Sequence, residues 1–115
     1  MRRFNQSAIG VQNGSQIIFS GFSEHDPMWS GRGERETKAR VDFDGPFLGA
    51  PIVHVSITML DMQRGANHRV DLSAENVTAE GFDLVFRTWG DTQVGRVRAD
   101  WLAIGPARHE DDWDV

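Results

Sequence analysis

The stretch Ile52-Val53-His54-Val55-Ser56-Ile57-Thr58-Met59-Leu60 decides the fold, because apolar and polar side chains alternate along most of it. In an extended chain, successive side chains point to opposite faces, so one face of this segment is apolar and the other polar. An amphipathic helix would instead repeat its apolar positions about every 3.6 residues. The stretch therefore predicts a β-strand that is buried on one side.

Other segments show the same period of two, and helical periodicity is nearly absent from the rest of the chain. These further predicted strands cover residues 15–20, 37–43, 69–75, 82–87 and 96–103. Turn-forming sequences separate many of them, such as Asp44-Gly45-Pro46 and Gly90-Asp91. About six strands at this spacing predict an all-β fold, a six-stranded antiparallel β-sandwich. Residues 21–36 show neither period and contain Gly, Ser, Asp and Pro, so we expect one long loop of the kind that often binds ligands.

Composition excludes several classes of function. The 115 residues fit one domain, and with no cysteine the chain has neither disulfides nor thiolate metal sites. A net charge of −5 argues against a nucleic-acid partner. No run approaches the ~20 apolar residues of a membrane span, so we expect no membrane insertion.

The chemistry-bearing residues predict no enzyme. The four histidines lack metal-ligand spacing, so we expect no metal. The carboxylates lie in polar, mixed-charge stretches rather than in a sequence context that would raise a pKa for glycoside hydrolysis. We therefore predict no catalytic residue and no cofactor. Without a signal-peptide pattern we expect synthesis in the cytoplasm, with any release or display on a particle or cell surface following a route that the sequence does not show.

Two side chains at strand ends are candidates for ligand contact. Trp101 falls on the apolar face of its strand and is expected in the core, whereas Trp89 falls on the polar face, immediately before a turn. Trp89 is either a platform for a ligand or a residue that packs against a loop or a neighbouring subunit. Arg69 begins its strand on the polar face, where an arginine is either a plain surface charge or a donor to a ligand. A sugar needs both kinds of group, since its C–H face packs on an indole and its hydroxyls accept from a guanidinium.

Together, these segments resemble the H-type lectin domain family. The resemblance covers residues 11–105 and is carried by Val11-Gln12-Asn13-Gly14, the stretch 51–61, Asn67-His68-Arg69-Val70, Asn76-Val77-Thr78, Gly81-Phe82, Thr88-Trp89-Gly90-Asp91-Thr92 and Trp101-Leu102-Ala103-Ile104. It implies a six-stranded sandwich that forms a homotrimer and binds galactose or N-acetylgalactosamine near subunit boundaries, without catalysis. By position, it implies that the stacking and hydrogen-bonding residues are Trp89, Arg69 and Asn67, with Gly90 and Asp91 beside them.

The chain departs from the family pattern at two positions. Members of the family place an aspartate in the long loop, where it fixes two sugar hydroxyls, but an ungapped alignment puts Arg32 there, with Glu34 nearby. Either Glu34 takes the acceptor role, or the ligand differs and carries negative charge. Gly90 stands where a known member has a histidine that meets the N-acetyl group, so specificity for N-acetylgalactosamine is in question.

These observations predict a lectin module that recognises galactose, N-acetylgalactosamine or related surface glycans in multivalent cell-surface recognition or adhesion. The alternative is a structural or attachment component, a spike or fibre of a phage-like particle that binds bacterial surface polysaccharide. We expect an N-terminal extension at 1–10, the domain at 11–105 and an acidic tail at 106–115, whose Trp113 could dock on a larger partner.

Overall fold

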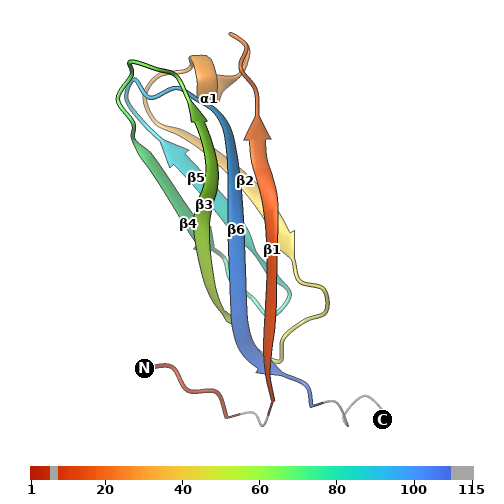
Figure 1. Cartoon of the computed structure of the whole chain (residues 1–115). Helices are drawn as coiled ribbons and strands as arrows, with labels where there is room; N and C mark the ends of the chain where they lie inside the picture. Colours follow the sequence, from red (N-terminus) through yellow and green to blue (C-terminus); the bar gives the residue numbers. More distant parts are fainter. Residues whose placement is uncertain (6–7, 110–115) are drawn as a thin grey trace.

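The computed structural model describes residues 1–5 and 8–109 as two antiparallel three-stranded sheets packed face to face (Figure 1). One sheet has the order β1-β6-β3 and the other β2-β5-β4. The strands are β1 (Ala8–Ser20), β2 (Arg35–Asp42), β3 (Ile52–Met62), β4 (Val70–Glu75), β5 (Gly81–Thr88) and β6 (Val94–Ala107). The six-stranded antiparallel sandwich predicted from the alternation is therefore confirmed. No helix in the described part of the chain has the length and apolar character needed to cross a membrane.

The first strand begins at Ala8, seven residues before the predicted start at Ser15, and pairs with β6 along its whole length. Glycines weaken the apolar alternation in this segment, and the structure explains one of them. Gly14 is paired with Trp101, and a Cβ at Gly14 would lie 2.7 Å from the indole Nε1. Because glycine has no side chain, the indole of Trp101 can pack directly against the backbone at position 14. Packing therefore requires glycine here, although glycine is a weak strand former.

The long loop also contains an element that was not predicted, the single-turn helix α1 (Pro27–Ser30). Pro27 occupies its first turn, where the missing N–H of proline has no helical partner to lose. Met28 is the buried residue of this turn and packs with Phe86, Val94 and Val97. The loop is thus anchored to the core between the two sheets.

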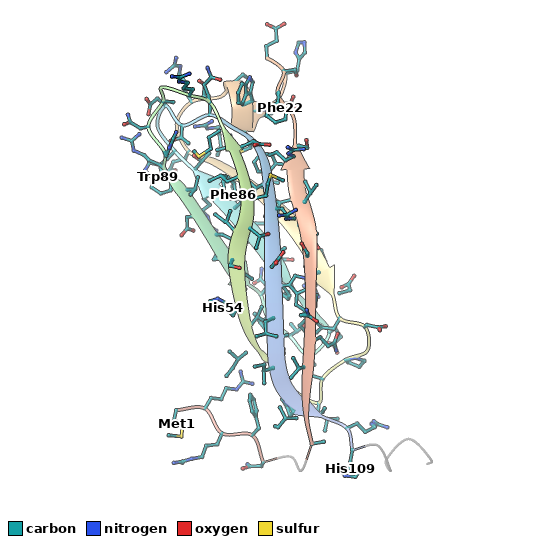
Figure 2. The ribbon with its side chains drawn as sticks, viewed as in Figure 1. Met1, Phe22, His54, Phe86, Trp89 and His109 are labelled. Atoms are coloured by element: carbon teal, nitrogen blue, oxygen red, sulfur yellow. The ribbon has the colours of Figure 1, made fainter. Side chains whose placement is uncertain are left out.

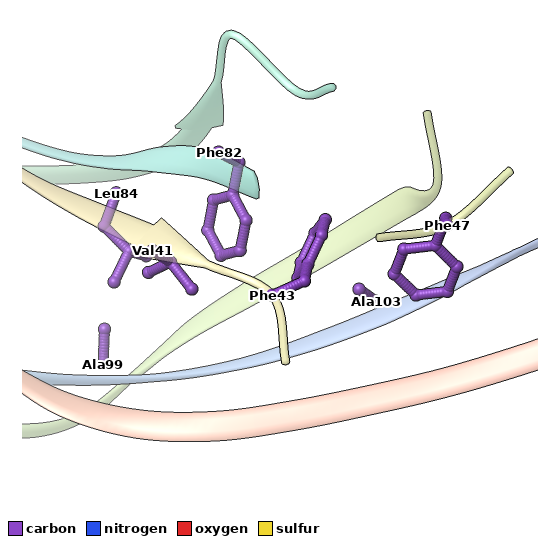
Figure 3. Packing of buried hydrophobic residues seen from close by; sticks show 7 residues of the cluster. All are labelled: Val41, Phe43, Phe47, Phe82, Leu84, Ala99 and Ala103. Atoms are coloured by element: carbon purple, nitrogen blue, oxygen red, sulfur yellow. The ribbon is translucent and has the colours of Figure 1, made fainter. Parts of the chain in front are cut away.

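A second, aromatic cluster fills the other half of the interface between the sheets (Figure 3). Phe43 stands at its centre, with ring centroids 5.0 Å from Phe47, 5.8 Å from Phe82 and 5.8 Å from Trp101. The expectation that Trp101 belongs to the core is confirmed by these contacts. Each such aromatic ring, when fully buried, contributes roughly 1.5–3 kcal/mol.

The outer face of the β1-β6-β3 sheet is apolar at the end where β6 finishes. Ile104 pairs with Val11 on one side and with Ile52 on the other, and Leu102 lies two residues before it on the same face. We call this the apolar face, defined by Ile9 (49% exposed), Val11 (61%), Ile52 (49%), Leu102 (38%) and Ile104 (37%). A contiguous exposed patch of this kind is typical of an interaction surface.

Candidate functional site

The outer face of the other sheet carries polar side chains in rows that the strand register defines. In one row, Arg87 of the central strand β5 lies between Glu36 of β2 and Asp71 of β4. Extending the register by one row beyond the last pairs, Arg35–Thr88 and Val70–Thr88, puts Trp89 between Glu34 and Arg69. A backbone hydrogen bond of 3.0 Å from Gly33 N to Gly90 O continues the pairing on the β2 side. Figure 2 shows Trp89 at this end of the sandwich, far from His109 at the other end.

A hollow of about 560 Å³ opens beside the indole of Trp89, which is 42% exposed. Its volume falls within the range of small-ligand sites. The lining residues are Glu34, Arg35, Glu36, Asp71, Arg87, Thr88 and Trp89. Of the residues predicted from the sequence, only Glu34 and Trp89 line the hollow, while Arg32 lies exposed on the loop outside it.

Arg87 forms the charged floor of the hollow. Its guanidinium lies 2.6 Å from Glu75, 2.9 Å from Glu36 and 3.9 Å from Asp71. Hydrogen bonds from Arg87 and then from Ser73 lower the pKa of Glu75 to about 2. These hydrogen bonds favour the ionised form of Glu75, and the three carboxylates together surround the guanidinium of Arg87.

On the other side of Trp89, Arg69 belongs to a separate hydrogen-bonded cluster. Its Nη1 donates to Asp91 at 2.8 Å, and the side-chain amide of Asn67 donates to both Asp91 oxygens at 3.2 Å. These bonds, led by the one from Asn67, lower the pKa of Asp91. The Arg69 side chain is 40% exposed, so part of its five-donor fork is open to a ligand.

Two buried threonine hydroxyls hold the backbone of this cluster. Thr88 donates to the carbonyl of Arg69 at 2.5 Å, and Thr92 donates to the carbonyl of Asn67 at 2.6 Å. Thr92 also accepts from the Arg69 N–H at 3.0 Å. The 63–69 segment is therefore tied to the turn that follows β5, which brings Arg69 next to Trp89.

Gly90 lies between Trp89 and the hydrogen-bonded cluster of Arg69, Asp91 and Asn67. Its φ of +70° favours glycine, and a Cβ at this position would lie 3.3 Å from Arg69 Nη1. The guanidinium thus packs against the turn directly after Trp89. Predicted site residues Asn67, Arg69, Trp89, Gly90 and Asp91 form one continuous surface, and Glu34 adjoins it through the hollow.

Arg35, which fastens the long loop to the site, was not predicted from the sequence. Its guanidinium donates to the carbonyls of Gly33 at 3.0 Å, Met28 at 3.1 Å and Gly90 at 3.2 Å. Burial, followed by the charge of Arg32, lowers its pKa. The alternation along the strand could have identified it. Arg35 falls on the inward face with Thr37 and Ala39, and an arginine on that face needs hydrogen-bond acceptors within the protein.

The chain offers no prepared metal site in residues 1–5 and 8–109, since no three histidine, cysteine or carboxylate side chains converge there. What the site presents is a half-exposed indole, an open carboxylate at Glu34 and a partly occupied guanidinium at Arg69. Such a surface can pack against an apolar ring face and exchange hydrogen bonds with hydroxyl groups.

The two packed antiparallel sheets define an all-β sandwich of the discoidin-like kind. Residues 38–104 match the H-type lectin domain family model, and the chain belongs to this family. The recombinant discoidin II of Dictyostelium discoideum has a similar structure, with a TM-score of 0.75 and 31% identity over 91% of this chain and 40% of that one.

Relatives in sequence agree with this assignment. Discoidin-2 of Dictyostelium discoideum is 36% identical over 76 residues, which is 65% of this chain and 30% of the relative. This chain thus matches under a third of that relative's length. A protein of Fuscovulum blasticum called ATP synthase subunits region ORF 7 is 49% identical over 109 residues, 95% of each chain. Its name states a genomic position and assigns no activity.

Proposed function

We propose that this protein is a non-catalytic carbohydrate-binding module whose site is the surface around Trp89. The observation that carries the proposal is the half-exposed indole flanked by a carboxylate at Glu34 and a guanidinium at Arg69. A pyranose stacks its C–H face on an indole, while its hydroxyls donate to carboxylates and accept from guanidinium N–H groups. Membership of a lectin family supports the same role.

Each residue of the site has a distinct part in this proposal. Trp89 supplies the stacking surface, Arg69 donates to ring hydroxyls, and Glu34 accepts from hydroxyls in place of the aspartate that the family resemblance implies. Asn67 and Asp91 hold the Arg69 guanidinium in position. Gly90 offers no side chain to the ligand, and Arg32 lies exposed on the loop outside the hollow. The ligand class is galactose, N-acetylgalactosamine or a related surface glycan.

Two carboxylates beside the site, Glu75 and Asp91, support binding rather than hydrolysis. A glycosidase needs one acid whose pKa is raised so that it is protonated at neutral pH. In the described part of the chain, the carboxyl groups whose pKa is shifted all have it lowered, namely those of Asp26, Glu75, Asp91 and Asp100. The hydrogen bonds that cause these shifts stabilise the ionised form, which accepts hydrogen bonds and donates none.

We further propose that three copies associate, as in the homotrimer that the family resemblance implies, and that the apolar face is the contact between them. Because that face lies at the end of the sandwich remote from Trp89, the proposed sugar site then lies away from this contact, unlike the sites near subunit boundaries that the resemblance implies. An open site with one stacking ring would bind a monosaccharide with a Kd on the order of 0.1–1 mM. Three sites on one assembly would raise the avidity for a glycan-coated surface by about 10² or more. The role would then be multivalent recognition of, or adhesion to, a cell surface.

The alternative of a spike or fibre component shares this sugar site and adds a docking tail. Residues 110–115, including Trp113, lie outside the described residues, so this alternative stays a prediction. The spike or fibre alternative predicts no ligand-binding site other than the one at Trp89.

The test is a glycan array probed with the wild-type protein and with Arg69→Ala and Trp89→Ala. Both variants are expected to lose glycan binding, while circular dichroism and thermal unfolding remain close to wild type because both side chains are partly exposed. Arg40→Ala is the matched control, since Arg40 lies three rows away on the same face of the sheet. Wild-type binding by both variants would exclude the proposed site.

A further inference from the structure

The charges around the hollow do not balance. Three carboxylates line it, from Glu34, Glu36 and Asp71, together with two guanidinium groups, from Arg35 and Arg87. Glu75 lies just outside the lining and takes the shortest contact to Arg87, at 2.6 Å. Lys38 lies close enough to Glu75 to help lower its pKa, so these two outer charges offset each other, and the lining itself carries three negative groups and two positive ones.

Both positive groups are already occupied within the protein. Arg87 is paired with Glu36 and Glu75, and Arg35 donates to backbone carbonyls of the loop and of Gly90. Both guanidinium groups therefore already have acceptors within the protein, and those of Arg87, whose side chain is 40% exposed, are carboxylates that repel an anionic ligand. A ligand that carries a carboxylate, sulfate or phosphate would meet Glu34 and Asp71 without a compensating partner.

Glu34 is in the opposite situation. Its carboxylate makes no ion pair or hydrogen bond with any described residue, although it lines the hollow beside the indole. Asp71 is held only at 3.9 Å from Arg87. The hollow thus presents one open carboxylate and one weakly compensated carboxylate next to an aromatic face, and an indole face itself attracts cations.

We propose that the hollow prefers a sugar bearing a free, protonated amino group, a hexosamine, over its neutral and N-acetylated counterparts, and that it rejects acidic sugars. Glu34 receives the ammonium group while the ring stacks on Trp89. This inference rests on the proposed carbohydrate-binding function and names the ligand class of the same site. Gly90 is consistent with it, because the turn after the indole carries no side chain for an acetyl group to pack against.

The experiment measures Kd for galactosamine, galactose, N-acetylgalactosamine and galacturonic acid by isothermal titration calorimetry on the intact protein at pH 6.5. At low ionic strength, galactosamine is expected to bind roughly 3- to 10-fold more tightly than galactose, because its ammonium group gains one exposed ion pair and one cation–π contact. Galacturonic acid is expected to bind most weakly. The preference should shrink in 0.5 M NaCl, because salt screens exposed charges.

Glu34→Gln is the decisive variant, since it keeps the shape and removes the charge. It is expected to bring the ratio of galactosamine to galactose affinity close to one. Glu80→Gln, an exposed carboxylate at the far turn, is the matched control and should leave the ratio as in the wild type.

The outcomes separate the two proposals. Equal affinity for galactose and galactosamine, or a preference that survives in Glu34→Gln, would overturn the hexosamine inference and leave the carbohydrate-binding function standing. Absence of binding to all four sugars and to every glycan of the array would overturn both.

Discussion

The guanidinium of Arg69 is paired with the carboxylate of Asp91 at 2.8 Å, and both side chains are about 40% exposed, at 40% and 42%. The pair is a contact within the protein itself, beside the turn that follows Trp89. Asn67 holds the same carboxylate through two further contacts. Because Asp91 restrains one end of the guanidinium, the remaining donors of Arg69 are oriented in advance, which lowers the entropy cost of binding.

Asp91→Asn should therefore weaken glycan binding several-fold without preventing folding. The amide keeps the shape but loses the charge that holds Arg69, and an ion pair this exposed contributes little to stability. Calorimetry with the tightest-binding sugar measures the affinity, and thermal unfolding measures the stability. Glu80→Gln makes the same chemical change at a distant site and should bind as the wild type does. An unaltered affinity in Asp91→Asn would show that Arg69 needs no such restraint.

The Arg87–Glu75 pair predicts sensitivity to acid. The pKa of Glu75 falls from 4.5 to about 2 in the folded protein. A lowered folded-state pKa means that the stabilisation is fully present above pH 4.5 and is lost as the pH falls from 4.5 toward 2. Thermal midpoints measured between pH 6 and pH 2.5 should fall less steeply for Glu75→Gln than for the wild type. Parallel pH profiles for the two proteins would contradict this account of the pair.

The apolar face predicts an oligomer that a single charge can disrupt. Ile104→Asp places a carboxylate between Val11 and Ile52, at the centre of that face. Size-exclusion chromatography with light scattering should give a trimer mass for the wild type and a monomer mass for the variant. Lys38→Glu, on the outer face of the other sheet, is the control and should remain trimeric. A wild-type monomer at micromolar concentration would rule out the proposed assembly.

The contact between Gly14 and Trp101 predicts a cost for one added methyl group. Gly14→Ala would bring its Cβ within 2.7–2.8 Å of the indole, which must then shift within a packed core. Overpacking of this kind costs about 1–3 kcal/mol, measurable by urea unfolding followed through tryptophan fluorescence. At Gly49 a Cβ would meet only Pro106, at an ordinary 3.8 Å. Gly49→Ala should therefore unfold near the wild-type midpoint, and equal losses in both variants would refute the packing argument.

The period of two predicted most of the fold because both sheets have one buried and one outer face. It placed Trp101 in the core and Trp89 on the outer face, as the structure has them. It was less accurate at Val85, which shares the outer face with Arg87 yet is only 1% exposed. Val85 lies on the central strand between Lys38 and Ser73, so its neighbours across the sheet cover it. Alternation reports the face of a residue and says nothing of what lies beside it.

For the candidate site too, the sequence predicted which residues face outward but not which residues lie beside them. Strand parity and the family resemblance pointed to Arg69 and Trp89, which lie directly beyond the Val70–Thr88 pair at neighbouring ends of β4 and β5. The hollow could not be predicted, because Glu36, Asp71 and Arg87 come from three strands and meet only through the pairing register. The start of β1 was missed for a related reason. The space beside Gly14 is filled by Trp101 of β6, which is next to β1 in the sheet but far from it in the sequence.

The pairing of Ala8 with Ala107 brings both ends of the described sandwich together, at the end remote from Trp89. A load applied between these two ends would peel β1 from β6 one pair at a time, because the ladder bonds run across the strands. A load applied between a glycan held at Trp89 and either end would pull along the strands and stress many of those bonds at once. If the protein were attached through these two ends and held a glycan at Trp89, the force would therefore act in the direction in which the strand pairing resists it more strongly.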